Sequence, residues 1–537
     1  MARTQPQPGL PATPQPGLPA GTSDLTTVPA GPLTPDSPES GQPSPSAAPA
    51  VPDALLATAE HGLAHRPQRA KKVIVLGAGM AGLVAAFELR RQGHEPVVLE
   101  AQNRVGGRVY TLRSRFAPGL YAEAGAMRIP RVHTLTLEYC KLFGLQLRPF
   151  VMGNAKTLLH LCGESMTFEQ ADREPHRLPF ELSDTETGRT WTQMWDEATA
   201  EIKEVYDREG EAGWQKIMEQ YDAYSLREFL ESKGWSDGAI EMYGVLSFRE
   251  QNMNTAVVEQ FFEIVGRAFE EMQEIVGGTD RLADAFYQRI ADTVRFGATV
   301  NAIEQDEDSV TVHYRNRAGR FSVTGDYAIC TLPFPVLSNI EVSPLMCRRK
   351  RQAIRELRYN PSTKILFQVR HRFWEGAGAG IVGGTTATDL PIRRIVYPSH
   401  SDPDTERGVL LASYTWGQDA LRWGSMAEED RIEQALEDVA KVHPEILTEF
   451  EVGATHAWFN DPHAGGAFAQ FEPGQATRIQ PHIITPEGRL HFAGEHCSLY
   501  HAWIQGALES GIRAAREIHE APEVAERTRA AREAYAG

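Results

Sequence analysis

The stretch GAGMAG (77–82) constrains the fold more than any other part of this 537-residue chain. It follows VIVLG (73–77), an apolar and β-branched run whose length is typical of a buried parallel strand. Residues 81–92 then have helical spacing, and PVVLE (96–100) has the composition of a second buried strand. Strand, helix and strand form one βαβ unit. The sequence therefore predicts an α/β fold that begins near residue 70 with a Rossmann-like domain.

The glycines of this stretch, Gly77, Gly79 and Gly82, have the spacing of a dinucleotide-binding turn. The first permits a tight turn, the second lets a pyrophosphate approach the backbone, and the third lets the helix pack on the sheet. The helix N-terminus adds free N–H groups and the positive end of a dipole. Glu100, at the end of the second strand, can accept hydrogen bonds from both ribose hydroxyls. An acidic residue there favours a cofactor whose ribose is not phosphorylated.

A second glycine turn, RVGGRVYT (104–111), follows closely and carries Arg104 and Arg108, which can bind a pyrophosphate that rests on the first turn. NAD-dependent dehydrogenases have no general need of such a segment. The whole run 73–108 resembles the signature of the flavin-containing amine oxidases, and the resemblance implies FAD as the cofactor. Covalent members of this group have a cysteine after the glycine pair where this chain has Ala467. We therefore expect FAD to be bound non-covalently.

The C-terminal stretch 488–515 resembles the closing motif of the same family. By this resemblance, Gly494 and Glu495 contact the ribityl chain, and a helix that begins near Trp503 directs its N-terminus at the flavin pyrimidine carbonyls. A strand residue, Val300, is expected at the adenine, and Trp458 is expected to stack on the flavin. The expected FAD-binding residues are Gly77, Gly79, Met80, Ala81, Gly82, Glu100, Ala101, Arg108, Ala126, Met127, Arg128, Val300, Trp458, Gly494, Glu495, Trp503 and Ile504.

The stretch AGAMRIP (124–130) resembles the AG-x-MR-x-P segment of L-amino-acid oxidases in this family. Its small residues are expected to admit the edge of the flavin. The resemblance implies that Arg128 forms a bidentate pair with the substrate α-carboxylate. It also implies that Tyr414, in VLLASYTWGQD (409–419), donates its hydroxyl to the same carboxylate. Monoamine and polyamine oxidases bind substrates without a carboxylate, so a buried arginine there would be a costly unpaired charge.

Four further residues are expected at the substrate. Lys364 resembles the lysine that holds a water near flavin N5 and is the expected catalytic residue. Trp503 should wall the amine side of the pocket, and the Ala502 carbonyl should accept from the amino group. Trp416 lies two residues from Tyr414 and so faces the same side of a strand. We expect this aromatic wall to suit aromatic or large apolar substrates, although it would also stack on the guanidinium of a basic one.

The resemblance implies FAD-dependent oxidation of an L-amino acid by molecular oxygen, giving a 2-oxo acid, ammonia and hydrogen peroxide. An L-amino-acid 2-monooxygenase, which releases carbon dioxide and leaves an amide, would carry the same motifs. An amine or polyamine oxidase is a second alternative. A flavin-binding protein without turnover is a third.

Composition excludes several other classes. The formal net charge of −17 opposes nucleic-acid binding, and no apolar run approaches the ~20 residues that span a bilayer. The five cysteines show no CxxC spacing, so we expect neither a disulfide framework nor a metal site. No secretory signal is visible, which favours a cytoplasmic enzyme. We expect a homodimer or higher homo-oligomer that binds small molecules and no membrane.

The chain is expected to divide into two terminal tails and three domains. The first 60 residues hold 14 of the 34 prolines, so residues 1–66 are expected to be a disordered tail or a removable pro-segment. The remaining boundaries are 70–130, 275–335 and 480–520 for the FAD-binding domain, 131–184 and 336–479 for a mixed-sheet substrate-binding domain, 185–274 for a helical subdomain, and 521–537 for a C-terminal tail.

Overall fold

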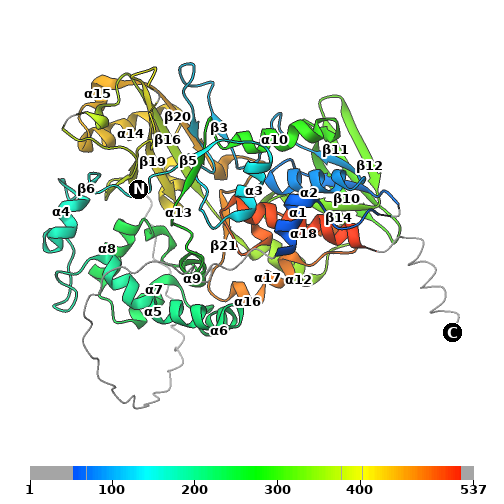
Figure 1. Ribbon diagram of the computed structural model, residues 1–537, viewed down its shortest axis with the longest axis horizontal. Coiled ribbons are helices and arrows are strands. Elements are labelled where there is room, and N and C mark those ends of the chain that lie inside the picture. Colours follow the sequence, from blue (N-terminus) through cyan, green and yellow to red (C-terminus); the bar gives the residue numbers. More distant parts are fainter. Residues whose placement is uncertain (1–52, 68, 377, 402, 522–537) are drawn as a thin grey trace, which may run out of the picture. The chain divides into compact units, whose positions relative to one another are not determined.

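The computed structural model describes residues 53–521 apart from 68, 377 and 402 (Figure 1). A five-stranded parallel sheet places the glycine-rich turn. Its strand order is β22-β13-β1-β2-β9, with β1 in the middle. Because the strands are parallel, their carboxyl ends meet at one edge, and the turn that follows β1 opens there. The strands are β1 (Lys72–Leu76), β2 (Glu95–Leu99), β9 (Val294–Arg295), β13 (Tyr327–Cys330) and β22 (Leu490–Phe492).

Helices pack on this sheet through a shared apolar core. α2 (Met80–Arg91) contacts both α10 (Asp280–Ile290) and α18 (Ile504–Glu520). The core joins Val73 and Val75 of β1 to apolar residues of these three helices. Ten consecutive residues of α2, Met80 to Leu89, are buried, and all of them except Glu88 are apolar or glycine. The predicted βαβ unit and the α/β fold class are therefore confirmed.

A seven-stranded mixed sheet forms the second layered unit. In Figure 1 its strands β16 and β19 lie in the yellow region, whereas β6 is cyan. Next to its edge strand β20, β16 pairs antiparallel with β19, and Lys364 lies opposite Tyr414 in the register. β18 pairs with the other edge of β19. In order across the sheet the strands are β20 (Phe450–Ala457), β16 (Ser362–Val369), β19 (Gly408–Trp416), β18 (Arg394–Val396), β17 (Thr385–Thr388), β6 (Leu158–Leu161) and β7 (Glu164–Thr167).

Helices cover one side of this sheet and build a separate helical region. α14 packs against β16, β19 and β20, and its apolar residues share a core with those strands. The predicted helical stretch appears in the lower left of Figure 1. The helices are α13 (Gly417–Gly424), α14 (Glu428–Val442) and α15 (Ile446–Glu449) beside the sheet, and α5 (Trp191–Glu209), α6 (Glu211–Tyr221), α7 (Leu226–Ser232), α8 (Asp237–Ser247) and α9 (Val258–Val265) in the helical region.

Four smaller sheets complete the strands of the described residues. β10 (Thr299–Gln305), β11 (Val310–Asn316) and β12 (Gly319–Gly325) form an antiparallel meander, and β14 (Glu341–Ser343) pairs parallel with β10. Three two-stranded sheets pair β3 (Thr111–Leu112) with β4 (Ala122–Glu123), β5 (Leu147–Pro149) with β8 (Gln273–Ile275), and β15 (Arg358–Asn360) with β21 (Phe468–Gln470). The remaining helices are α3 (Thr134–Leu142), α4 (Phe168–Arg173), α11 (Phe334–Leu337), α12 (Arg348–Glu356), α16 (Gln475–Arg478) and α17 (Gln480–Ile484).

The N-terminal boundary differs from the prediction. Residues 53–66 were assigned to a tail, but α1 (Asp53–His61) is a helix there. Leu55, Ala59 and Leu63 are buried in the core that contains α2 and α18. The ALLATA stretch lacks proline and carries this apolar face, so it folds onto the domain. Residues 1–52 and 522–537, which hold the rest of the predicted tails, lie outside the described residues.

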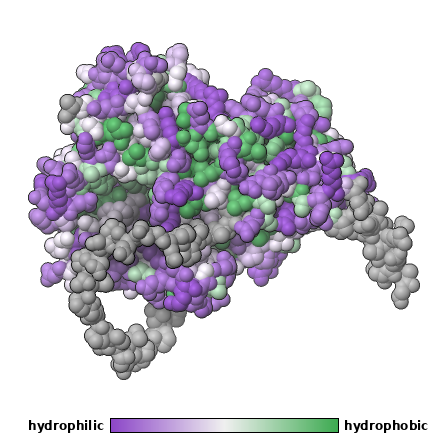
Figure 2. Space-filling model, viewed as in Figure 1, coloured by the Kyte–Doolittle hydropathy of each residue, from purple (hydrophilic) through white to green (hydrophobic). Residues whose placement is uncertain are grey.

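The face drawn in Figure 2 is mostly hydrophilic, with apolar residues gathered near its middle. None of the helices in the described ranges is both long and apolar enough to cross a membrane.

Candidate active site

One cavity of about 600 Å³ collects the residues that the sequence singles out. It extends from the turn after β1 to the face of the seven-stranded sheet. Every predicted site residue lines it except Gly82 and Arg104. Gly82 instead packs under the turn, because a Cβ there would lie 2.0 Å from the Gly77 carbonyl oxygen. The cavity is thus continuous between the predicted cofactor and substrate residues, whose roles stay predictions.

The first turn of α2 forms an open cradle at one end of the cavity. A Cβ built on Gly79 would meet no atom within 4 Å, so the space above it is free for a phosphate. No side chain of the described residues caps the N-terminus of α2. Glu100 is buried and fixed, because its carboxylate accepts from the N–H groups of Ala78 at 2.7 Å and Gln102 at 2.8 Å. This end of the cavity therefore offers open space over a helix N-terminus and a fixed carboxylate, the two features that the predicted pyrophosphate and ribose require.

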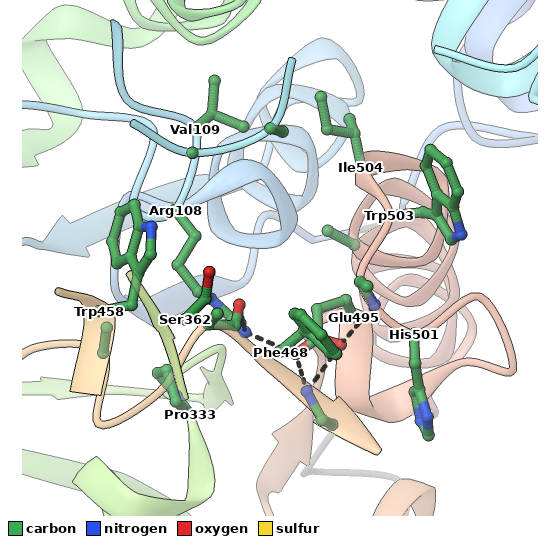
Figure 3. Close-up of a pocket in the computed structure, with 18 of the residues that line it drawn as sticks. Arg108, Val109, Pro333, Ser362, Trp458, Phe468, Glu495, His501, Trp503 and Ile504 are labelled. Carbon is green, nitrogen blue, oxygen red and sulfur yellow. Dashed lines mark hydrogen bonds and ion pairs between the residues drawn. The ribbon is translucent and has the colours of Figure 1, made fainter. Parts of the chain in front are cut away.

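The second glycine turn contributes a buried ion pair. Arg108 Nη1 lies 2.7 Å from Glu495 Oε1 and 3.1 Å from the Ala467 carbonyl oxygen. Although burial opposes the charge, Glu495 outweighs it and holds the pKa of Arg108 above its ordinary value. Figure 3 shows Arg108 reaching toward Glu495, with Trp458 and the Trp503–Ile504 start of α18 on opposite sides of the drawn pocket.

Arg104 does not share this position. Its guanidinium carbon lies 4.0 Å from the centre of the Tyr110 ring, and its Nη1 donates to the Val105 carbonyl at 3.3 Å. It is also absent from the cavity wall. The expectation that Arg104 and Arg108 both reach a pyrophosphate is therefore wrong for Arg104, because stacking on Tyr110 turns it away.

The start of α18 is held at the other end of the cavity. No side chain of the described residues caps the N-terminus of α18 at Trp503, so its first N–H groups are available to a bound electronegative group. The residue before it, Ala502, has φ +65, a region in which only glycine is unstrained. Its N–H donates to Glu495 Oε2 at 3.1 Å, which fixes this backbone. Glu495 thus connects Arg108 to the segment that carries Ala502 and Trp503.

The stretch 124–128 runs beside the cavity because neighbouring backbone fixes it. A Cβ on Gly125 would lie 1.9 Å from the Arg108 carbonyl oxygen, so this glycine is required by the second glycine turn. Residues 124–128 all line the cavity, and the expectation that the small ones admit the edge of the flavin stays a prediction. Trp458 Nε1 donates to the Ala124 carbonyl at 2.9 Å and holds the same stretch from another side.

Arg128 extends from this stretch and lines the cavity. Its Nε is buried and has no hydrogen-bond partner among the described residues. Burial lowers the pKa of Arg128, while Tyr414 is the group that most favours its charged form. Tyr414 stands on β19 between two cations: Lys364 Nζ is 4.6 Å and the Arg394 guanidinium carbon is 4.7 Å from its ring centre. The site therefore offers an anion a buried guanidinium beside a phenol.

Two arginines on this wall were not predicted from the sequence. Arg394 lies over the Trp416 ring, 4.5 Å from its centre, where a substrate side chain was expected to stack. Arg249 also lines the cavity but is paired with Glu263, whose Oε2 lies 2.7 Å from its Nη2. A sequence signal for Arg394 exists in retrospect, since it stands in the otherwise apolar strand RIV and must place its charge in a pocket.

A family model described as flavin containing amine oxidoreductase matches residues 80–519. The chain belongs to this family. Its cofactor is FAD, and the open glycine cradle, the uncapped helix ends and the buried Arg108–Glu495 pair described above fit that group. The protein is a flavin-dependent amine oxidoreductase, and the predicted family and cofactor are confirmed.

Relatives within the family include L-amino-acid oxidases. The chain is 40% identical over 461 residues to YobN of Bacillus subtilis (strain 168), which covers 85% of this chain and 96% of the relative. It is 34% identical to the L-amino-acid oxidase of Siganus canaliculatus, over 87% of this chain and 88% of the relative. It is 33% identical to the L-amino-acid oxidase of Bothrops atrox, over 88% of this chain and 92% of the relative.

Solved structures of amine oxidases share the fold. Putrescine oxidase bound to putrescine aligns with a TM-score of 0.68 at 21% identity, over 84% of this chain and 99% of that chain. Cyclohexylamine oxidase from Brevibacterium oxydans IH-35A aligns with a TM-score of 0.67 at 19% identity, also over 84% and 99%. The flavin amine oxidase fold is therefore confirmed.

Proposed function

We propose that this protein oxidises an L-α-amino acid to the 2-oxo acid, ammonia and hydrogen peroxide. One observation carries the proposal: Arg128 places a buried, unpartnered guanidinium nitrogen in the cavity beside Tyr414. An amine without a carboxylate would leave this charge unpaired, which is costly. Relatives named L-amino-acid oxidases at 33–34% identity support the same assignment.

The residues of the cavity would orient the substrate. Arg128 and the Tyr414 hydroxyl would bind its carboxylate, which fixes the position of Cα. The carbonyl of Ala502, in a backbone held by Glu495, is proposed to accept from the amino group. Bound FAD supplies a two-electron acceptor for the Cα–H bond and passes the electrons to oxygen. Because the amino group must be neutral when Cα is oxidised, turnover should rise toward alkaline pH.

Lys364 has a proposed part in ordering this site. Its Nζ donates to the carbonyls of Gly125 at 2.7 Å and Glu123 at 3.1 Å. Burial lowers its pKa, and Glu123 opposes that shift. Its third contact is with Met127 Sδ at 3.5 Å, a weak acceptor, and we propose that a water in the cavity takes this donor instead. The imino acid that leaves would then be hydrolysed by water without a further protein group.

Non-covalent attachment of FAD is also part of the proposal. Ala467 lies on the cavity wall where covalent relatives would need a thiol, and its carbonyl accepts from Arg108 at 3.1 Å. Acid precipitation should therefore release all of the flavin into the supernatant. Flavin that stays with the pellet would contradict this.

Product analysis tests the proposed reaction. The holoenzyme is incubated with each of the twenty L-amino acids and with their decarboxylated amines, and peroxide, ammonia and carbon products are identified. We expect peroxide with 2-oxo acid from amino acids only. An amide with carbon dioxide would instead indicate a 2-monooxygenase, and turnover of amines alone would indicate an amine oxidase. If no compound bleaches the flavin without oxygen, the protein is not an oxidase of either class.

A further inference from the structure

The cavity holds a second open cation besides Arg128. Arg394, the first residue of β18, is 8% exposed and lines the cavity. Its Nε donates to the Tyr414 carbonyl oxygen at 2.8 Å. That bond anchors the guanidinium, while its two terminal nitrogens have no hydrogen-bond acceptor and no ion-pair partner in the described part of the chain.

Aromatic rings hold the faces of this guanidinium. Its carbon lies 4.7 Å from the ring centre of Phe248, 4.7 Å from that of Tyr414 and 4.5 Å from that of Trp416. These rings restrict the orientation of the guanidinium plane, and they leave the edge that carries the terminal N–H groups open to a ligand. An anchored plane with two open N–H edges is the geometry that binds a carboxylate in a bidentate pair.

Nearby acidic side chains are committed to other cations. Glu250 pairs with Arg393 at 3.3 Å, Glu263 pairs with Arg249 at 2.7 Å, and Glu259 lies 2.9 Å from His501. Burial lowers the pKa of Arg394 to about 9, with Arg128 and Arg249 acting in the same direction. The charge is therefore poorly compensated by the protein, and an anion bound in the cavity would compensate it.

We propose that Arg394 binds the side-chain carboxylate of the substrate, so that the enzyme prefers acidic L-amino acids. This inference rests on the proposed function, in which Arg128 takes the α-carboxylate. Two open guanidinium groups in one cavity match a substrate with two carboxylates. The Trp416 ring, expected to stack on an aromatic or apolar substrate, stacks on Arg394 instead. The side-chain preference inferred from the sequence is thereby replaced.

The test compares charged substrates with their neutral isosteres. We measure kcat/KM for L-glutamate, L-glutamine, L-aspartate, L-asparagine and L-leucine with the wild-type holoenzyme and with Arg394→Met and Arg394→Lys. In the wild type, kcat/KM for glutamate should exceed that for glutamine, or kcat/KM for aspartate that for asparagine, by more than about 100-fold. The amide cannot form the bidentate charged pair that the carboxylate forms with Arg394. Arg394→Met should lower this acid-to-amide ratio at least about 30-fold, and Arg394→Lys should restore part of it.

A neighbouring arginine supplies the control. Arg393 is also on this segment but pairs with Asp419 at 2.8 Å and does not line the cavity. Arg393→Met should leave the acid-to-amide ratio unchanged even if it lowers stability. A ratio near one in the wild type would overturn the inference, as would an equal loss for all five substrates in Arg394→Met. The second result would place Arg394 at the α-carboxylate or in the fold.

The two proposals fail in different ways. If the wild type turns over no amino acid in the full panel, the proposed function fails and the inference falls with it. If other amino acids are oxidised but none of these five is, only the inference fails. If neutral amino acids are oxidised to 2-oxo acids but acidic ones are not preferred, the proposed function stands and the role of Arg394 is refuted. Flavin content and the urea unfolding midpoint of each variant show whether a loss comes from misfolding.

Discussion

Lys364 Nζ donates a hydrogen bond to the Gly125 carbonyl oxygen over 2.7 Å. A second bond joins the same nitrogen to the Glu123 carbonyl at 3.1 Å. Strand β16 of the seven-stranded sheet is thereby attached to the stretch that ends in Arg128. The position of Arg128, the proposed anchor of the substrate carboxylate, thus depends on a buried lysine 236 residues later in the chain.

Lys364→Met should damage both stability and catalysis. Two buried carbonyls lose their donor, which costs about 1–3 kcal/mol for each unpaired group, and the stretch before Arg128 loses its attachment. We expect kcat/KM to fall at least tenfold, measured by peroxide release, together with a lower urea midpoint.

Lys350→Met is the matched control for this variant. Lys350 is also fully buried and donates to the Ile483 carbonyl at 2.7 Å, but it does not line the cavity. It should lower the urea midpoint similarly and leave kcat/KM of the folded fraction close to wild type. Equal catalytic losses in the two variants would show that Lys364 matters only for stability.

Gly79→Ala should separate cofactor binding from folding. A Cβ there meets no protein atom within 4 Å, and the backbone φ of −71 is one that alanine adopts readily. The methyl group would instead occupy the space proposed for the pyrophosphate. We expect a folded protein whose flavin content, measured from the ratio of absorbance at 450 and 280 nm, is strongly reduced.

The contrasting variant is Gly82→Ala, whose Cβ would lie 2.0 Å from the Gly77 carbonyl oxygen. This change should distort the turn itself and lower both the yield of folded protein and its thermal midpoint. A Gly79→Ala protein with a full complement of flavin would contradict the proposed path of the pyrophosphate.

The parts of the site set by local sequence were the predictable ones. The turn at 77–82 and the strand end at Glu100 follow from glycine spacing and strand length within one βαβ unit. Arg394 depends on the alignment of β18 with β19, which no local pattern encodes. Arg104 and Arg108 are equivalent in sequence, and only the nearby Tyr110 ring and the distant Glu495 separate them. The short α1 was missed because its apolar face follows a proline-rich stretch.

Arg128→Lys should test the carboxylate anchor. A lysine keeps the charge but cannot form the bidentate pair, so the Cα–H bond is held less accurately. We expect kcat/KM for the preferred amino acid to fall about 10²-fold or more. If the variant weakens binding of the ground state and the transition state equally, most of this loss will be an increase in KM. We expect low turnover of the decarboxylated amine of the same amino acid in the wild type. The Arg128→Lys variant should not lower this turnover to the extent that it lowers turnover of the amino acid. A parallel loss would mean that Arg128 supports the fold or the flavin rather than the substrate.

His133→Phe should make the protein less sensitive to acid. Burial lowers the pKa of His133 to about 3, and its Nε2 has no partner among the described residues. The unfolded chain binds a proton below its ordinary pKa near 6.5, whereas the folded state does not, so this histidine removes stability as the pH falls from 6.5 toward 3. Glu88 and Glu123, whose pKa values burial raises, gain stability as the pH falls in that range, so the pH profile of the wild type alone does not isolate His133.

The measurement is the unfolding free energy of His133→Phe minus that of the wild type, from urea titrations at pH 7.5 and 4.5. This difference should be about 2–3 kcal/mol larger at pH 4.5 than at pH 7.5. If this difference is the same at both pH values, His133 takes up its proton in the folded protein as readily as in the unfolded chain. That result would contradict a neutral imidazole packed beside Trp503.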